Sequence, residues 1–264
     1  MDASFGPRCA VCSHYHEPGV ACTICGHKGL STKHRKFKAA CTSSEAASST
    51  LHAFVYETCA AERRNPLHSL ARIIRRRVFV EELKQAALPA GMDAAVDATA
   101  RHVVAMVGHA AQGCTRWRVL TAPFVACAAA AAAGVRGPSA PPGAFLAHIS
   151  PGIAALDALG MAPGTRVAYI DRLCVLPRHR RMGVASHVLG KLVEDIAAFG
   201  GAAAAGDPPI AAIVAPCEEN AALAALFGGL GFRPHGSAFA SRAASTVARG
   251  VAPTPSRLLV LQRA

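Results

Sequence analysis

The feature of this sequence that most constrains its fold is an apolar strand followed by a glycine turn and an amphipathic helix. Residues 166–176 (RVAYIDRLCVL) have the β-branched and apolar content of a buried strand. After Gly183, apolar residues recur at the spacing of one helical face, at Val184, Val188, Leu192 and Ile196. A strand, a tight turn and a helix in this order predict an α/β domain.

The turn between this strand and helix, RHRRMGVA (residues 178–185), has the composition of an anion-binding site. A helix N-terminus presents free backbone N–H groups and the positive end of the helix dipole, and glycine lets an anion approach closely. Arg178, Arg180 and Arg181 add positive charge. The pattern predicts a phosphate-bearing ligand, and the alternative is a plain turn with a basic corner. It is not a Walker loop, because no Gly-Lys-Ser/Thr follows.

Further strands and helices are expected from about residue 50 to the end of the chain. Alternation and apolar runs predict strands at 51–60, 100–109, 116–128, 208–216 and 257–264. Apolar periodicity predicts two more helices, at 65–85 and 218–232. The three arginines at 75–77 are expected on a solvated helix face. An alanine- and proline-rich insertion is expected at about 126–144.

Four cysteines near the start of the chain have the spacing of a zinc site: Cys9, Cys12, Cys22 and Cys25. Two C-x2-C pairs can supply four thiolates to one tetrahedral Zn²⁺. A segment this short cannot build a core, so the metal would supply its folding free energy. The pattern predicts a zinc-ribbon-like module at 1–30 with structural zinc. The alternative is a set of unliganded thiols in a disordered tail.

A basic and serine-rich linker is expected at 31–50, which leaves 51–264 as the main domain. The net charge of +12 favours an anionic partner, such as nucleic acid, a phosphate-bearing cofactor or an acidic surface. Ten cysteines without a secretory signal predict an intracellular protein, cytoplasmic or nuclear. No apolar run approaches the roughly 18 residues of a membrane span, so no membrane association is expected.

Two motifs of the main domain resemble the GNAT superfamily of N-acetyltransferases. Arg180-x-x-Gly183-x-Ala185 after a strand is similar to the acetyl-CoA signature of that family. Asn220 and the run LFGGLGF (226–232) are similar to the family's helix that passes the pantetheine arm and ends in Leu-Gly-Phe.

A third motif, upstream, extends the resemblance. RVFVEEL (77–83), followed by Asp93, Asp97 and ARHVVA (100–105), is similar to one GNAT subgroup in which a helix end of this kind precedes spaced aspartates and a histidine-led strand. The resemblance covers residues 51–262. It implies an α/β (α+β) fold with a mixed central sheet flanked by helices, and transfer of an acetyl group from acetyl-CoA to an amine by direct attack.

The resemblance also implies how acetyl-CoA is held. Backbone N–H groups of residues 181–186 would bind the pyrophosphate, and the strand at 173–175 would pair with the pantetheine and help to polarise the thioester carbonyl. Asn220 would bond the pantetheine arm. The implied cofactor-binding residues are Leu173, Cys174, Val175, Arg180, Arg181, Met182, Gly183, Val184, Ala185, Ser186, Asn220 and Phe227. Because attack is direct, no cysteine nucleophile is needed, and Cys174 and Cys217 are expected to be packed thiols.

The catalytic groups are less fully specified. Many GNAT enzymes carry a tyrosine at the position of Phe227, which has no hydroxyl. A base must deprotonate the substrate ammonium. Tyr169, Asp171 and Leu173 are expected on one strand face by period two, a face that carries a catalytic glutamate at the Tyr169 position in some relatives. Asp171 is the expected base, and the alternative is that it pairs with an arginine for structural reasons.

Other candidate bases remain open: Glu81, Glu82 and Glu218. His102 is expected to be a structural histidine. The acceptor is a small amine or a protein. The competing hypothesis is a zinc-dependent interaction or nucleic-acid-binding protein whose GNAT domain binds CoA without catalysis, and it expects salt-dependent nucleic-acid affinity.

Overall fold

The computed structural model describes residues 51–57, 66–83, 96–107, 110–124, 152–153, 155–201, 207–240 and 255–262. The predicted zinc module with Cys9, Cys12, Cys22 and Cys25, the linker and the insertion at about 126–144 lie outside these ranges. The predictions made for them therefore remain predictions.

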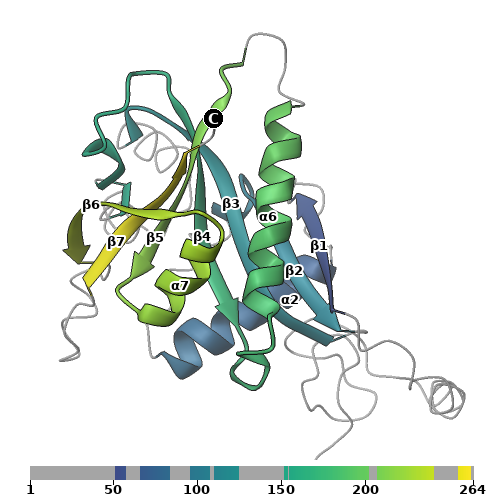
Figure 1. Ribbon diagram of the computed structural model, residues 1–264. Coiled ribbons are helices and arrows are strands. Elements are labelled where there is room, and N and C mark those ends of the chain that lie inside the picture. Colours follow the sequence, from purple (N-terminus) through teal and green to yellow (C-terminus); the bar gives the residue numbers. More distant parts are fainter. Residues whose placement is uncertain are drawn as a thin grey trace, which may run out of the picture.

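In the described part of the chain, seven strands form one sheet in the order β1-β2-β3-β4-β5-β7-β6. Every neighbouring pair is antiparallel except β4 and β5, which are parallel and lie in the middle of the sheet (Figure 1). The mixed sheet expected from the sequence is confirmed. The strands are β1 (Leu51–Glu57), β2 (Arg101–Val107), β3 (Ala110–Thr121), β4 (Arg166–Val175), β5 (Ile210–Glu218), β6 (Arg233–Ala240) and β7 (Pro255–Gln262).

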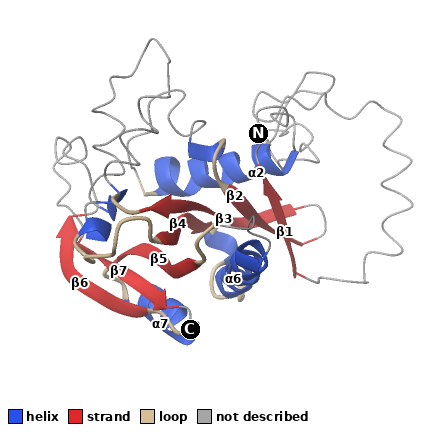
Figure 2. Ribbon diagram, turned by 90° about the horizontal axis from the view of Figure 1, so that it is seen from above, coloured by secondary structure: helices blue, strands red, loops and turns tan. Residues whose placement is uncertain are grey.

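Helices cover both faces of the sheet. Helix α2 (Pro66–Arg75) continues as a π-helical segment η3 (Arg76–Glu82) and lies on one face. Helices α6 (Val184–Gly201) and α7 (Ala221–Gly229) lie on the other, as Figure 2 shows. A short 3₁₀ segment, η4 (Pro177–His179), leads from β4 toward α6. The helices predicted at 65–85, from 184 onward and at 218–232 are all present.

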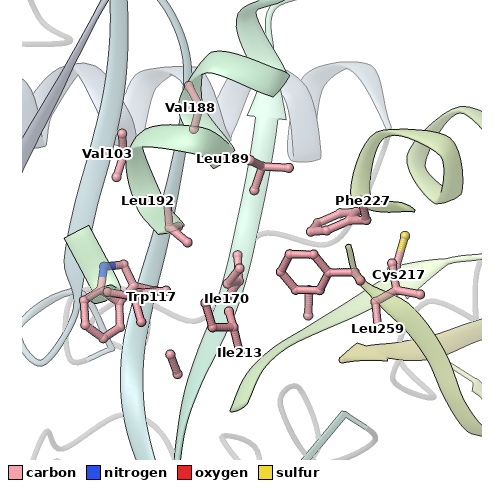
Figure 3. Close-up of a cluster of buried hydrophobic side chains, with 14 of the residues drawn as sticks. Val103, Trp117, Ile170, Val188, Leu189, Leu192, Ile213, Cys217, Phe227 and Leu259 are labelled. Atoms are coloured by element: carbon pink, nitrogen blue, oxygen red, sulfur yellow. The ribbon is translucent and has the colours of Figure 1, made fainter. Parts of the chain in front are cut away.

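The main core lies between α6, α7 and the sheet (Figure 3). Helix α6 buries the apolar face expected from its periodicity, with Val188, Leu189, Leu192 and Ile196 fully enclosed. These side chains pack on Trp117 of β3, Ile170 of β4 and Ile213 of β5, among others. Burial of several large aliphatic side chains, each worth about 1.5–3 kcal/mol, fixes α6 and therefore the turn before it on the sheet.

A second core lies between α2 and the opposite face. Ile74 and Val78 pack there with Val104 of β2 and with Cys114 and Cys174, which face each other across β3 and β4. The apolar periodicity that predicted a helix at 65–85 corresponds to this buried face, since Leu70, Ile74 and Val78 are buried and Leu67 is half-buried.

Two strands differ from expectation. The strand expected at 116–128 begins earlier, at Ala110, and ends at Thr121. Strand β6 (RPHGSAFA) was not expected, because it lacks apolar alternation; it is an edge strand with mostly exposed side chains.

Candidate active site

The two parallel strands at the centre of the sheet, β4 and β5, are paired over only part of their length. Their pairing runs from Arg166↔Ile210 to Tyr169↔Val214, although β4 continues to Val175 and β5 to Glu218. Figure 1 shows the two strands separating toward their C-terminal ends. Beyond Tyr169, the edge of β4 that faces β5 therefore has no ladder partner among the described residues. Such an edge can pair with an extended ligand, as in β-strand addition.

A β-bulge lies in the same part of β4. Between the pairs Cys114↔Cys174 and Arg116↔Asp171, β3 advances two residues and β4 three. The extra residue is accommodated near Arg172, whose φ is +57°. Leu173 consequently packs into the α6 core, whereas Tyr169 packs on the other face of the sheet, in a cluster that includes Leu120 and Val214. The expectation that Tyr169, Asp171 and Leu173 share one face is wrong, because the bulge interrupts the two-residue period.

The turn after β4 has the backbone geometry of an exposed helix N-terminus. Arg181 and Gly183 both have positive φ, at +61° and +78°. The first bond of α6 runs from the His187 N–H to the Gly183 carbonyl at 3.0 Å, so the N–H groups of residues 184–186 precede the helical ladder. Val184 is buried, whereas Met182 is 65% exposed. In the predicted anion cradle, the buried Val184 side chain thus fixes the start of α6 on the sheet, and the turn before it is exposed to solvent.

Arg180, one of the three cations predicted at this turn, is engaged by other groups of the protein. Its Nε donates to the Val175 carbonyl at 3.1 Å, and its Nη1 and Nη2 donate to the two carboxylate oxygens of Glu82 at 2.6 and 2.7 Å. The side chain ties η3 to the end of β4. Arg178 and Arg181 are exposed and supply the remaining positive charge at this turn. The Nε of Arg178 donates a hydrogen bond to His179 Nε2.

Asp171 is held by an arginine. Arg116 donates to it from Nε at 2.5 Å and from Nη2 at 3.3 Å. Burial raises the pKa of Asp171, but the charges of Arg116 and Arg118 and the bonds from Arg116 outweigh burial, so the pKa lies below its ordinary value. A carboxylate of this kind stays ionised and accepts a proton poorly. The geometry favours the structural alternative for Asp171.

Tyr169 is also unsuited to proton transfer. Its side chain is buried, and burial followed by the charge of Asp171 raises its pKa above the ordinary tyrosine value. A Cβ added to Gly152 would lie 2.7 Å from its hydroxyl, so Gly152 covers this end of the ring. The interpretation of Tyr169 as a catalytic residue is therefore not supported by its position.

Two residues expected to contact the cofactor, Asn220 and Phe227, make contacts within the protein instead. The Asn220 side-chain oxygen caps α7 by accepting from the N–H groups of Ala222 and Leu223 at 2.9 and 3.3 Å. Phe227 is buried and packs edge-on against Phe232, with ring centroids 5.1 Å apart. Its ring belongs to the core, so direct contact of that side chain with a cofactor is not supported.

The cysteines of the sheet are packed thiols, as expected. The Cys174 and Cys114 sulfur atoms are 3.5 Å apart, and burial raises the pKa of Cys174. Burial, followed by the charge of Glu218, raises the pKa of Cys217 to about 11. The Cys174 side chain faces the α2 core, so only its backbone is available to a ligand at the β4 edge.

A buried charge network beside the bulge was not anticipated. Asp97 is fully buried and pairs with Arg75 and with Arg116, whose Nη1 donates to it at 2.6 Å. Arg75 is 4% exposed, so the expectation that it is solvated is wrong. His102 Nε2 lies 3.2 Å from the Asp97 carbonyl, and burial lowers its pKa to about 4. No local pattern signals these pairs, because their members come from distant parts of the sequence.

Within the described ranges, no group of three or more histidine, cysteine or acidic residues could hold a metal ion. Among the same residues, no helix is both long and apolar enough to cross a membrane.

The comparisons with known proteins agree with this geometry. Residues 140–207 match the family model described as "Acetyltransferase (GNAT) family". The matched segment contains β4, the turn and α6. No curated protein sequence matches the chain significantly.

Among solved structures, polyamine N-acetyltransferase from Drosophila melanogaster aligns with a TM-score of 0.53 at 14% identity, over 80% of this chain and 100% of that one. Escherichia coli ElaA aligns with a TM-score of 0.48 at 12% identity, over 81% and 100%. FeeM, an N-acyl amino acid synthase from uncultured soil microbes, aligns with a TM-score of 0.48 at 14% identity, over 81% and 92%.

The alignment with the Drosophila enzyme shows that the chain has the fold of that acetyltransferase. The family match falls on the part of the domain that carries the predicted cradle. Together they support a GNAT-type domain that includes β4, the turn and α6.

Proposed function

We propose that this protein is an N-acetyltransferase that moves an acetyl group from acetyl-CoA to an amine by direct attack. The observation that carries the proposal is the end of β4–β5 pairing at Tyr169↔Val214, beside an exposed helix N-terminus. One extended ligand with a pyrophosphate at one end matches both features. The N–H groups of residues 181–186 would bind the pyrophosphate, and the free edge of β4 at 173–175 would pair with the pantetheine amides.

The reaction requires few protein groups. The amine nitrogen attacks the thioester carbonyl, the C–S bond breaks, and CoA leaves as a thiolate that solvent can protonate. Backbone N–H groups at the β4 bulge are suited to stabilising the oxyanion that develops on the carbonyl. Phe227 supplies no proton, and its ring is buried.

Glu218 is the carboxylate best placed to accept the ammonium proton. Glu81 pairs with Arg76, and Glu82 pairs with Arg180. Glu218 ends β5 at the open side of the fork and forms no ion pair in the described part of the chain. It is half-buried, and the alternation of β5 puts it on the face of Val214, opposite α6. A proton can therefore leave the substrate on the side away from the cradle.

The test is amine-dependent release of free thiol from acetyl-CoA, followed for the zinc-loaded protein and for Glu218→Gln. We expect turnover by the parent protein and a fall of kcat by about 10²-fold in the variant. Glu81→Gln is the matched control, and its rate should not change. An unaltered kcat in Glu218→Gln removes the base assignment. Acetyl-CoA binding without any turnover favours the non-catalytic alternative.

The same proposal includes the N-terminal module. The spacing of Cys9, Cys12, Cys22 and Cys25 fits one structural Zn²⁺ that targets the enzyme or shapes its substrate mouth. Metal analysis should give one zinc per chain, and Cys9→Ser should lower that content while thiol release stays measurable. A chain that holds no zinc after expression in zinc-supplemented medium contradicts the module.

A further inference from the structure

Arg118 of β3 is a buried cation that forms no ion pair with any described residue. It is 7% exposed, and its Nε and Nη2 atoms are buried with no hydrogen-bond partner among the described residues. Its guanidinium carbon lies 5.7 Å from the centroid of the Tyr169 ring. An uncompensated charge in a protein interior is costly, so a side chain held in this state calls for a partner of opposite charge.

The neighbouring carboxylates are already engaged. Arg75 and Arg116, the other buried arginines of the described residues, share Asp97 between them, and Arg116 also binds Asp171. Three buried arginines thus face two carboxylates. Asp171 is close enough for the charge of Arg118 to lower its pKa, but it forms no ion pair with Arg118. One positive charge remains beside Tyr169.

The free edge of Arg118 has the shape that binds a carboxylate. Two arginines of this structure use the same pair of atoms, Nε and Nη2, to contact both oxygens of one carboxylate. Arg116 does so with Asp171 at 2.5 and 3.3 Å, and Arg101 does so with Asp195 at 2.9 and 2.7 Å. In Arg118 this edge is the part without a partner. A planar carboxylate would complete the same two-point contact.

The position of Arg118 points to the acceptor and not to the cofactor. Trp117 packs into the α6 core, and strand alternation sends Arg118 to the opposite face, where Leu120 and Tyr169 pack. The anion cradle precedes α6, beyond the far end of β4. Arg118 pairs with Tyr169, the last residue of β4 that is still paired to β5. It therefore lies next to the apex of the fork, on the face away from α6.

We propose that Arg118 is a specificity residue that binds the carboxylate of the acceptor, so that the substrates are amines carrying a carboxylate. This inference rests on the proposed acetyltransferase function. The acceptor carboxylate would sit on the Nε–Nη2 edge of Arg118, and the amine would lie toward the fork. Sites built around a buried polar group reject analogues that lack its partner, because the group is then left unpaired.

The test compares amines that differ only in the carboxylate: lysine with cadaverine, arginine with agmatine, and phenylalanine with phenethylamine. Thiol release is measured for the parent protein, Arg118→Gln, Arg118→Lys and the control Arg166→Gln. Arg166 lies at the other end of β4 and pairs with Asp207. For at least one pair, we expect the parent protein to prefer the carboxylate-bearing member by about 10²-fold in kcat/KM. Arg118→Gln should abolish that preference, Arg118→Lys should restore part of it, and Arg166→Gln should keep it.

A second readout needs no catalysis. The thermal stabilisation of the protein by each amine is measured without acetyl-CoA, for the parent and for Arg118→Gln. Stabilisation by the carboxylate-bearing members that Arg118→Gln removes supports the subsite. If the protein neither binds acetyl-CoA nor releases thiol, that result overturns the proposed function but leaves the subsite standing. The subsite is overturned if the parent treats both members of every pair alike, or if Arg118→Gln keeps the preference.

Discussion

At the scale of single residues, the structure separates charges that are paired from charges that are available. Arg116 bonds both Asp97 and Asp171 and so joins the segment before β2 to the β4 bulge. Asp171 is thereby engaged in holding the bulge, and Glu218 is the proposed base. Removing one member of a buried pair leaves the other charge uncompensated, so these residues should control stability more than chemistry.

Arg116→Met tests the structural role. It leaves Asp97 and Asp171 facing one fewer cation, and we expect the free energy of unfolding to fall by about 3–5 kcal/mol. The matched control is Lys191→Met, which breaks the exposed pair with Glu194 and should cost about 0.5 kcal/mol or less. Urea denaturation of the three proteins gives both numbers. A loss of stability in Arg116→Met no larger than in the control contradicts the network.

The buried His102 makes stability depend on pH. Burial lowers its pKa from 6.5 to about 4, so the unfolded chain binds the proton more readily than the folded one. Its contribution is present above pH 6.5 and is lost as the pH falls toward 4. By linkage this loss is about 3 kcal/mol.

Urea denaturation between pH 7 and pH 4 measures the effect. Stability should fall steeply in the parent protein and less steeply in His102→Gln. The exposed His235 provides the control, and His235→Gln should follow the parent curve. Parallel curves for the parent and His102→Gln would exclude His102 as the source.

At the scale of elements, the unit β4–turn–α6 positions the site. Burial of one face of α6 fixes the helix, and two residues with positive φ bring the chain from β4 to its N-terminus. This unit was predictable from the sequence, because strand and helix have strong and different periods. The bulge was not, since nothing in the letters around Arg172 marks an inserted residue. The pairs of Asp97 were not predictable either, because they join segments that only the folded sheet brings together.

Glycine substitutions test the turn. Gly183 has a φ of +78°, and a Cβ placed there meets no atom within 4 Å, so Gly183→Ala should be strained without a clash. We expect it to lower the free energy of unfolding by about 1 kcal/mol. Gly190→Ala in the middle of α6 also meets open space and should instead raise stability by about 0.5–1 kcal/mol. Equal signs for the two changes would contradict the assigned turn geometry.

At the scale of the whole molecule, the proposed cofactor and acceptor sites lie on opposite faces of the sheet. The cradle opens before α6 on one face, and Arg118, Tyr169 and Glu218 belong to the other, with the fork between β4 and β5 joining them. The sequence motifs were sufficient to predict the strand, turn and helix that form the proposed cradle, because these elements are adjacent in sequence. They were insufficient to predict the proposed acceptor site. The role of Arg118 depends on Asp97 and Asp171 being bound by Arg116, and only the folded structure shows these contacts.

The most direct test of the central claim is a calorimetric titration of acetyl-CoA into the parent protein and Gly183→Asp. The claim predicts micromolar binding by the parent. It predicts a loss of at least about 10²-fold in Gly183→Asp, because a carboxylate at the helix N-terminus would repel the pyrophosphate. Circular dichroism establishes that the variant is folded. Equal affinities in the two proteins, or no binding by the folded parent, would contradict the assignment of this turn as the cofactor site.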